Sequence, residues 1–454
     1  MGYKAYPKYK YSEVESFGDI PDHWQLFPLK FGLQTSITDG PHETPELLSE
    51  GIPFLSAEAV KNDRLNFNRK RGFISEEEHA KFSKKYRPQK GDVYMVKSGA
   101  TTGNVARVET DEDFNIWSPL AAIRPNPRMT TTDFIFYFMK SKSFFYAVEQ
   151  AWSFGTQQNI GMGVISNLKI AVPPVHEQEK IGAFLNYKTA KIDRLIEKKQ
   201  ELIEKLQEQR ITTITQAITK GVASGVAIKE SNNQWFDSIP IHWQVIRLKD
   251  LVVDAIAGPY GSSLTKSMYT NSGYRVYGQQ QVIPEDFAIG DYHISDEKYE
   301  EMQRYRTLPG DILISVMGTI GRAALVPDDA EPGIINPRLV LYRANKRIVR
   351  PEYLKHFINS QPSQNYFSLV AQGTTMEGIN MALIGELAVA VPPLSEQDEI
   401  LLTQQARTAL LEKQVQSVAN AIERLQEYRK ALITAAVTGQ IDVRNELKDI
   451  DNGG

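Results

Sequence analysis

The chain has 454 residues, which is enough for two to four domains with sizeable cores. Its 52 Lys and Arg against 55 Asp and Glu give a net charge of −3, which excludes a basic protein that coats nucleic acid unaided. The absence of cysteine excludes disulfides, Cys-ligated zinc and thiol catalysis. No apolar run approaches the roughly 20 residues that cross a membrane, and the polar N-terminal segment lacks the apolar core of a signal peptide. We therefore expect a cytoplasmic protein.

An internal repeat organises the chain. Residues 20–30 (IPDHWQLFPLK) share seven identities with residues 239–249 (IPIHWQVIRLK), at a constant separation of 219 positions. The same separation relates Gly91-Asp92 to Gly310-Asp311, and LKIAVPPVHEQEKI at 168–181 to LAVAVPPLSEQDEI at 387–400. A single separation over several distant segments predicts two tandem copies of one unit.

Each copy changes character once along its length. Short apolar runs punctuated by Gly and Pro come first and are typical of strands and turns with a few helices. Residues 183–220 and 394–438 then contain neither Gly nor Pro and are rich in Glu, Lys, Gln and Leu, as long helices are. The expected fold is mixed α/β (α+β) globular domains plus long coiled-coil helices, duplicated in tandem with pseudo-twofold symmetry. The expected boundaries are 1–172 and 222–391 for the globular domains, 173–221 and 392–440 for the helices, and 441–454 for a polar C-terminal tail.

Both long segments carry apolar residues at alternating spacings of four and three, as helices that pair with another helix do. The expected helix-pairing residues are Ile192, Ile196, Ile203 and Leu206 in the first segment, and Leu411, Val415, Val418, Ile422, Leu425 and Leu432 in the second. Arg429 interrupts the second series. Either each helix packs on its own globular domain, or the two helices pair and hold the globular parts apart. The repeat favours pairing, because each copy then supplies one half of a matched seam.

Motifs for catalysis are missing. The chain has no GxxxxGK[ST] loop for ATP, and its two Pro-Pro pairs lack the polar residue with which a DNA amino-methyltransferase grips its target base. The run His176-Glu177-Gln178-Glu179-Lys180 lacks the second histidine of a zinc helix. His23 and His242 are repeat equivalents beside a tryptophan, and we interpret both as structural. We expect no enzymatic activity and no metal site.

Two copies of one module on a spacer suit a linear polymer that is contacted at two separated places, and DNA is the obvious candidate. Residues 61–90 hold ten Lys and Arg against four acids, an excess that neutralises phosphates or that simply forms a solvated face. Three loops in each copy combine glycine with short polar residues, so that backbone can approach a groove closely. Gln and Asn contact adenine through two hydrogen bonds, and Arg contacts guanine in the same way.

The candidate DNA-binding residues of the first copy are Thr38, His42, Arg69, Lys70, Arg71, Lys84, Lys85, Lys97, Ser98, Thr101, Thr102, Gln157, Gln158 and Asn159. Those of the second copy are Tyr260, Ser262, Ser263, Gln279, Gln280, Gln281, Thr319, Arg322, Thr374 and Thr375. Any one of them fits a surface or turn residue as well. Because the loops differ between the copies while the frame is kept, the set indicates two different half-sites.

With these motifs in hand, the chain resembles a DNA-specificity subunit of a type I restriction-modification system over nearly all of its length. The duplicated Ile-Pro-x-His-Trp opening, the Gly-Asp strand with its glycine-threonine loop, and the duplicated Pro-Pro-x-x-Glu-Gln helix entry carry the resemblance. It implies two target-recognition domains, which read a bipartite sequence, and two antiparallel helices that fix the unread gap. It also implies double-stranded DNA and two methyltransferase subunits as partners, and restriction subunits as further ones. S-adenosylmethionine for adenine N6 methylation, ATP and Mg would then act in those partners and not in this chain.

Three alternatives stay open. The chain could be a stand-alone sequence-specific DNA-binding protein, against which the acidic balance counts. It could be a non-DNA scaffold that gathers proteins through its coiled coil, to which the glycine-polar loops give little support. It could also serve a combined nuclease-methyltransferase, because that difference lies in the other subunit.

Overall fold

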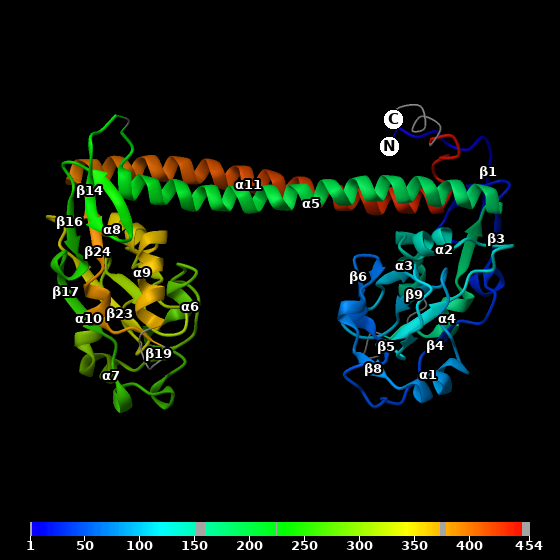
Figure 1. The fold of residues 1–454 in the computed structure, drawn as a ribbon, viewed down its shortest axis with the longest axis horizontal. Coiled ribbons are helices and arrows are strands. Elements are labelled where there is room, and N and C mark those ends of the chain that lie inside the picture. Colours follow the sequence, from blue (N-terminus) through cyan, green and yellow to red (C-terminus); the bar gives the residue numbers. More distant parts are fainter. Residues whose placement is uncertain (1, 151–158, 224, 373–377, 447–454) are drawn as a thin grey trace. The chain divides into compact units, whose positions relative to one another are not determined.

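The computed structural model describes residues 2–150, 159–223, 225–372 and 378–446 (Figure 1). The chain divides into two compact units: residues 1–199 with 420–454, called unit 1, and residues 200–419, called unit 2. Each unit is a mixed α/β body with its own buried cores, which confirms the expected class. The expected boundaries differ from this division, because each long helix gives one half to unit 1 and the other half to unit 2.

Unit 1 is built on a six-stranded sheet of order β4-β12-β9-β10-β7-β6 and a three-stranded sheet of order β11-β5-β8. Two further pairs, β1-β2 and β13-β3, complete it. The strands are β1 Tyr9–Tyr11, β2 Asp19–Pro21, β3 Gln25–Pro28, β4 Thr38–Asp39, β5 Ile52–Leu55, β6 Val60–Lys61, β7 Arg64–Leu65, β8 Gly72–Ile74, β9 Val93–Val96, β10 Val105–Arg107, β11 Asn115–Ile116, β12 Leu120–Ile123 and β13 Lys169–Val172. The short helices are α1 Glu76–Ser83, α2 Thr132–Met139, α3 Lys142–Gln150 and α4 Met162–Asn167.

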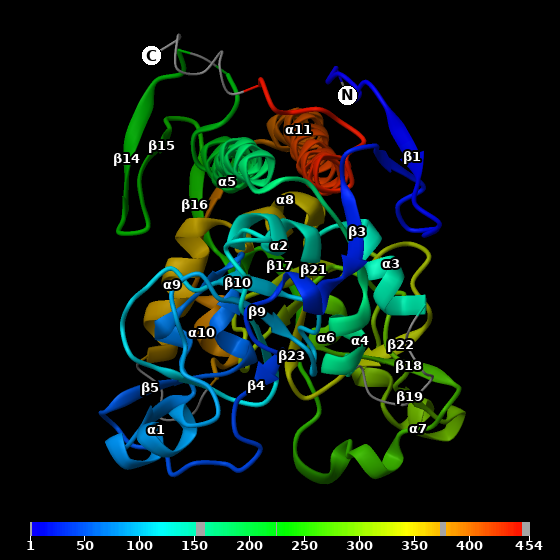
Figure 2. The same cartoon turned by 90° about the vertical axis from the view of Figure 1, so that its right-hand side faces the viewer.

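Unit 2 repeats this plan with a four-stranded sheet of order β17-β23-β20-β21, a three-stranded sheet of order β19-β18-β22, and the pairs β14-β15 and β16-β24. The strands are β14 Ile228–Asn233, β15 Phe236–Pro240, β16 Gln244–Arg247, β17 Val252–Ala257, β18 Tyr274–Tyr277, β19 His293–Ile294, β20 Ile312–Ser315, β21 Ala323–Leu325, β22 Gly333–Ile335, β23 Leu339–Ala344 and β24 Ala388–Val391. The short helices are α6 Gln279–Val282, α7 Asp296–Glu301, α8 Pro351–Ile358, α9 Gln361–Gln372 and α10 Met381–Gly385. Figure 2 shows the same elements from a second direction.

The repeated motifs form the frame of each unit. In unit 1 the buried Glu177 carboxylate accepts hydrogen bonds from the Trp24 indole at 2.9 Å and from the Tyr6 hydroxyl at 2.7 Å, and it lies 2.9 Å from His23 Nε2. In unit 2 Glu396 accepts from Trp243 at 3.1 Å, and His242 lies 2.7 Å away. The Ile-Pro-x-His-Trp opening thus packs on the Pro-Pro-x-x-Glu-Gln helix entry. Both histidines take part in this contact, which agrees with their interpretation as structural.

The aspartate of the Gly-Asp turn forms an ion pair with an arginine in both units. Asp92, which is buried at the start of β9, pairs with Arg124 at 2.7 Å, and Asp311 at the start of β20 pairs with Arg343 at 2.8 Å. Both arginines follow the same 219-residue separation. The duplicated residues therefore hold strands and helices together, and what distinguishes the units must be sought elsewhere.

The long helices are α5, Val175–Lys220, and α11, Leu394–Val437. Each begins directly after its Pro-Pro pair. The α5 helix continues through Gly182, where a Cβ would lie 2.8 Å from the Cβ of Asp133. Glycine is therefore required there for α2 to approach, and this explains why the glycine-free stretch starts later than the helix does.

The two long helices also meet within each unit. In unit 1 Arg429 of α11 binds Asp193 of α5 at 2.8 Å. In unit 2 Arg210 binds Glu412 at 3.2 Å, and the Gln404 amide donates to the Ile214 carbonyl at 3.3 Å. All ten expected helix-pairing residues are buried or half-buried: Ile192, Ile196, Ile203, Leu206, Leu411, Val415, Val418, Ile422, Leu425 and Leu432.

The segment after α11 differs from the expected polar tail. Ile441 and Val443 are buried in the main core of unit 1, and the Asp442 amide donates to the Lys4 carbonyl at 2.7 Å. The apolar residues that alternate with polar ones in this segment explain the difference. Residues 447–454 lie outside the described part of the chain. Among the described helices, none is both long and apolar enough to cross a membrane.

Candidate nucleic-acid interface

The described parts of the expected glycine-polar loops of unit 1 gather at one edge of the main sheet. Strand β12 is antiparallel to both β4 and β9, and it pairs Ala121 with Asp39 and Leu120 with Val96. The last residues of β4 and β9 and the first residue of β12 therefore lie side by side. The loops that follow β4 and β9 must leave the sheet at this same edge.

The turn 117–119, just before β12, lies at the centre of this edge. A Cβ at Gly40 would lie 1.8 Å from the Ile116 carbonyl oxygen, so the first loop passes directly over this turn and requires glycine there. The Lys97 amide donates to the Pro119 carbonyl at 2.8 Å, and Ser98 forms a β-bridge with Asn159. The described ends of all three loops are thus brought together.

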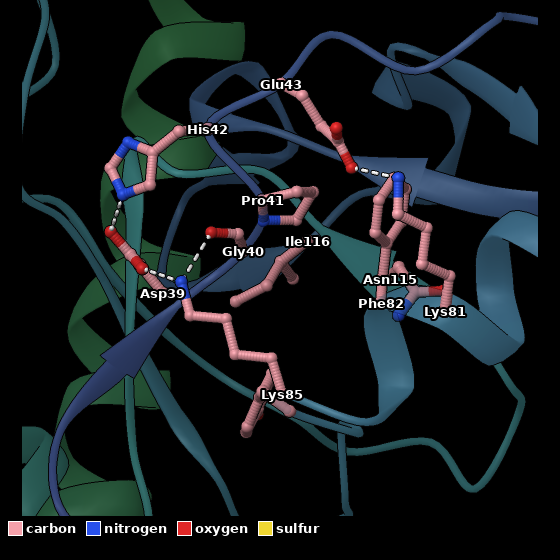
Figure 3. A pocket seen from close by; sticks show the side chains of 11 residues that line it. Asp39, Gly40, Pro41, His42, Glu43, Lys81, Phe82, Lys85, Asn115 and Ile116 are labelled. Carbon is pink, nitrogen blue, oxygen red and sulfur yellow. Dashed lines mark hydrogen bonds and ion pairs between the residues drawn. The ribbon is translucent and has the colours of Figure 1, made fainter.

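A pocket of 340 Å³ opens beside the first loop (Figure 3). It is lined by Asp39, Gly40, Pro41, His42, Glu43, Lys81, Phe82, Lys85, Tyr86, Asn115 and Ile116. The Lys85 ammonium lies 2.6 Å from Asp39 Oδ1, while Lys97 and the exposed His42 each lie 3.3 Å from Oδ2. Burial alone would raise the pKa of Asp39, but Lys85 and Lys97 outweigh it and hold this pKa below its usual value. One buried carboxylate thus holds two lysines and the His42 imidazole at the edge.

Other cations of the basic segment 61–90 are also compensated. Lys81, Arg87 and Lys90 pair with Glu43, Asp113 and Asp111 at 2.6, 2.7 and 3.2 Å. Lys70 lies 4.6 Å above the Phe73 ring. Arg69 and Lys84 are exposed, and the Arg71 guanidinium lies 3.9 Å over the Trp117 ring. The excess charge is therefore smaller at the surface than the residue count indicates.

Unit 2 presents the corresponding edge with different residues. Strand β23 pairs Val340 with Ala257 and Leu339 with Ser315, so the loops after β17 and β20 meet there. A Cβ at Gly258 would lie 2.0 Å from the Asn336 carbonyl oxygen, and Met317 forms a β-bridge with Gly378. The predicted residues Tyr260, Ser262, Ser263, Thr319 and Arg322 are exposed on these loops.

The three consecutive glutamines of unit 2 have different environments. Gln281 is completely buried; its side chain accepts from the Gly278 amide and donates to the Ile289 carbonyl, both at 2.9 Å. The prediction that Gln281 contacts DNA bases is therefore wrong, because its amide is used to cap α6. Gln279 donates to the Met317 carbonyl, and Gln280 is exposed.

The remaining predicted residues divide into two groups. Thr38, Ser98 and Thr102 are half-buried and Thr101 is exposed, and the Thr102 hydroxyl donates to the Gly99 carbonyl at 2.6 Å. Gln157, Gln158, Thr374 and Thr375 lie outside the described residues.

Sequence reasoning missed the turns at the centre of both edges. Trp117 and Asn336 are 219 positions apart, so they occupy equivalent places in the two copies but differ in chemistry. The signal for them in the sequence is a pair of repeat positions with different residues, and it does not coincide with the glycine-polar runs.

The edges offer hydrogen-bond donors, aromatic rings and cations, which are groups that bind and position a ligand. Among the described residues no group of three His, Asp or Glu is placed to hold a metal ion. Exposed Arg, Lys, Ser, Thr and Tyr side chains beside closely approaching backbone are the groups that contact phosphates and base edges in DNA.

Comparisons with known proteins agree with this chemistry. The family described as "Type I restriction modification DNA specificity domain" matches residues 42–205 and again 240–421. The specificity subunit of the type I restriction enzyme MjaVIII from Methanocaldococcus jannaschii is 23% identical over 321 residues, which cover 66% of this chain and 70% of the relative. That of EcoKI from Escherichia coli K12 is 21% identical over 455 residues, 96% of this chain and 94% of the relative.

Solved structures share the fold. A chain solved in a study of complex assembly and conformational transition of the type I R-M system has a TM-score of 0.67 at 16% identity, and the match covers 92% of this chain and 98% of that one. The crystal structure of the HsdS subunit from Thermoanaerobacter tengcongensis has a TM-score of 0.50 at 17% identity, with 93% and 98% covered. The chain, with its two matched domains, therefore belongs to the type I restriction-modification specificity subunits, the DNA-recognition subunits of these systems.

Proposed function

We propose that the chain reads a bipartite DNA target, with one half-site contacted by the sheet edge of unit 1 and the other by that of unit 2. The observation that carries this proposal is that the two edges share one frame and differ in the residues they expose. Phosphate contacts set the register of such a reader, and base-edge contacts specify the sequence. Two unlike edges on like frames suit a target with two unlike halves.

The long helices would separate the two edges. The Arg429–Asp193 and Arg210–Glu412 pairs are related by 219 positions with the helices exchanged, as an antiparallel coiled coil with pseudo-twofold symmetry requires. The buried positions at spacings of three and four support the same arrangement. The gap between the half-sites then depends on helix length, at about 1.5 Å per residue.

The chain itself would catalyse nothing and would act in the cytoplasm. Two methyltransferase subunits would bind it, flip the target adenine into their own pockets and use S-adenosylmethionine. Restriction subunits would add ATP- and Mg-dependent steps. Membership of the specificity-subunit family supports this division of labour, as does the absence of an ATP-binding loop from the sequence.

The proposal is tested by mapping N6-methyladenine by single-molecule sequencing in source cells with the gene intact and deleted. We expect one split motif to lose its methylation on deletion. Exchange of residues 20–170 for those of another family member should then change one half-site only. A loss of both halves in a well-folded chimera would contradict independent readers, and unchanged methylation after deletion would contradict the assigned role.

Helix length provides a second test. Insertion of seven residues after position 199 and seven after position 419 keeps the heptad phase in both helices. It should lengthen the gap by roughly 10 Å, or about three base pairs, and leave both half-sites intact. A changed half-site with an unchanged gap would contradict the spacer role. Insertion in one helix alone is the control, because it breaks the match between the helices and should abolish methylation.

A further inference from the structure

Arg71 differs from the other cations of the basic segment in its surroundings. Its guanidinium lies 3.9 Å over the Trp117 ring, and the side chain as a whole is exposed. Within the described part of the chain no carboxylate pairs with it, whereas Lys81, Lys85, Arg87 and Lys90 each have one. Arg71 therefore keeps its hydrogen-bond donors available while an aromatic ring restricts its position.

The backbone fixes this stack at the centre of the unit 1 edge. The Arg71 amide donates to the Phe54 carbonyl at 2.9 Å, and the Trp117 amide donates to the Leu55 carbonyl at 2.8 Å. Strand β5, which lies between β8 and β11, thus holds both residues next to each other. Gly40 crosses the backbone of the same turn, so the stack lies beside the first loop.

We propose that Arg71 is a guanine-reading residue of unit 1, held by Trp117 with its planar fork directed toward the DNA. This inference rests on the proposed function. Arginine contacts guanine O6 and N7 through two parallel hydrogen bonds, and stacking on an aromatic face leaves the donors at the edge of the guanidinium plane free for them. A flexible arginine must lose rotamer freedom when it binds a base, and one already stacked loses less.

A phosphate contact is the competing role, and the two roles predict different effects. Loss of a phosphate contact weakens binding uniformly across sequences and reduces its salt dependence. Loss of a base contact relaxes one position of one half-site. Arg69, an exposed arginine two residues away, lies over no aromatic ring of the described residues and offers a matched comparison for the phosphate role.

The experiment maps N6-methyladenine across the genome of source cells that carry the wild-type gene, Arg71→Gln, Arg71→Lys or Arg69→Gln. We expect Arg71→Gln to accept other bases at one guanine position of the half-site that exchange of residues 20–170 alters. Discrimination there should fall roughly 5- to 100-fold. Arg71→Lys should lose part of it, because a lysine has no fork, and Arg69→Gln should lower methylation evenly without changing the motif.

Two results would overturn the inference while the proposed function stands. One is an Arg71→Gln motif that is unchanged at every position, with methylation lowered evenly. The other is a unit 1 half-site that contains no G·C pair. If the wild-type gene directs no split motif at all, the proposed function fails first, and that result is distinct from both.

Discussion

The edges of units 1 and 2 are built on equivalent strands but present different polar side chains. Unit 1 gathers cations around the buried Asp39 carboxylate and stacks Arg71 on Trp117. Unit 2 has Asn336 in place of Trp117, exposes Tyr260 and Arg338, and uses Gln281 as an internal cap. The repeated residues therefore maintain the frame, and the residues of the edge can change without loss of the fold.

The contacts of the helix-entry glutamate differ between the two units, and we expect the largest effect on stability from its substitution. Among the described residues, Glu177 is 1% exposed and has three partners, whereas Glu396 is 16% exposed and has two. Glu177→Ala leaves buried Trp and Tyr donors unsatisfied and should lower the free energy of unfolding by about 3–5 kcal/mol. Glu396→Ala should cost about 1–3 kcal/mol. Urea unfolding of the two variants measures both, and equal losses would contradict the difference between the units.

Much of the frame could be predicted from the sequence, because residues that recur at one separation mark the contacts that both copies need. The histidine-tryptophan motif, the Gly-Asp turn and the helix entry belong to this class. For the edges, only the position of the loops could be predicted. The stack of Arg71 on Trp117 joins residues 46 positions apart through the order β8-β5-β11, and no local pattern encodes this order. The prediction for Gln281 was wrong for a related reason: a single helical turn exposes Gln280 and buries Gln281.

A second difference concerns acid stability. His356 of α8 in unit 2 takes the place of Tyr137, whose hydroxyl donates to Asn186 at 2.8 Å in unit 1. Burial, with the nearby Lys355 and Arg210, lowers the pKa of His356 from 6.5 to about 4. Between these two pH values the unfolded chain binds more protons than the folded one. The contribution of His356 to the free energy of unfolding is therefore complete above pH 6.5 and is lost as the pH falls toward 4.

At pH 5 this loss should reach about 2 kcal/mol for unit 2. His356→Gln removes the titrating group, and it should shrink the difference in Tm between pH 7 and pH 5. Tyr137→Phe in unit 1 is the control and should leave this pH difference unchanged. A wild-type Tm that is independent of pH over this range would rule out the role of His356.

A third difference lies where the globular parts meet the long helices. In unit 1 Arg429 binds both Asp193 and Asp63, and Lys140 also binds Asp63. Burial alone would raise the pKa of Asp63, but Lys140 and Arg429 outweigh it and hold it low. In unit 2 the ion-pair partner of Arg210 among the described residues is the exposed Glu412.

Arg429→Gln should therefore lower the free energy of unfolding by about 2 kcal/mol, since it leaves a half-buried carboxylate with one partner fewer. Arg210→Gln should cost less than about 1 kcal/mol, as exposed pairs do. Thermal unfolding at low and high salt checks both values. Equal losses of stability in the two variants would contradict this difference between the units.

The smallest expected effect separates structural from exposed glutamines within one edge. Gln281→Ala removes the acceptor of the Gly278 amide and the donor to the Ile289 carbonyl, and it should cost about 1–2 kcal/mol. Gln280→Ala, on an exposed side chain, should fall within about 0.5 kcal/mol of wild type. Hydrogen exchange at the Gly278 amide reports the difference directly, with faster exchange expected only in Gln281→Ala. If both variants leave that amide protected, the Gln281 side chain does not supply the cap of α6.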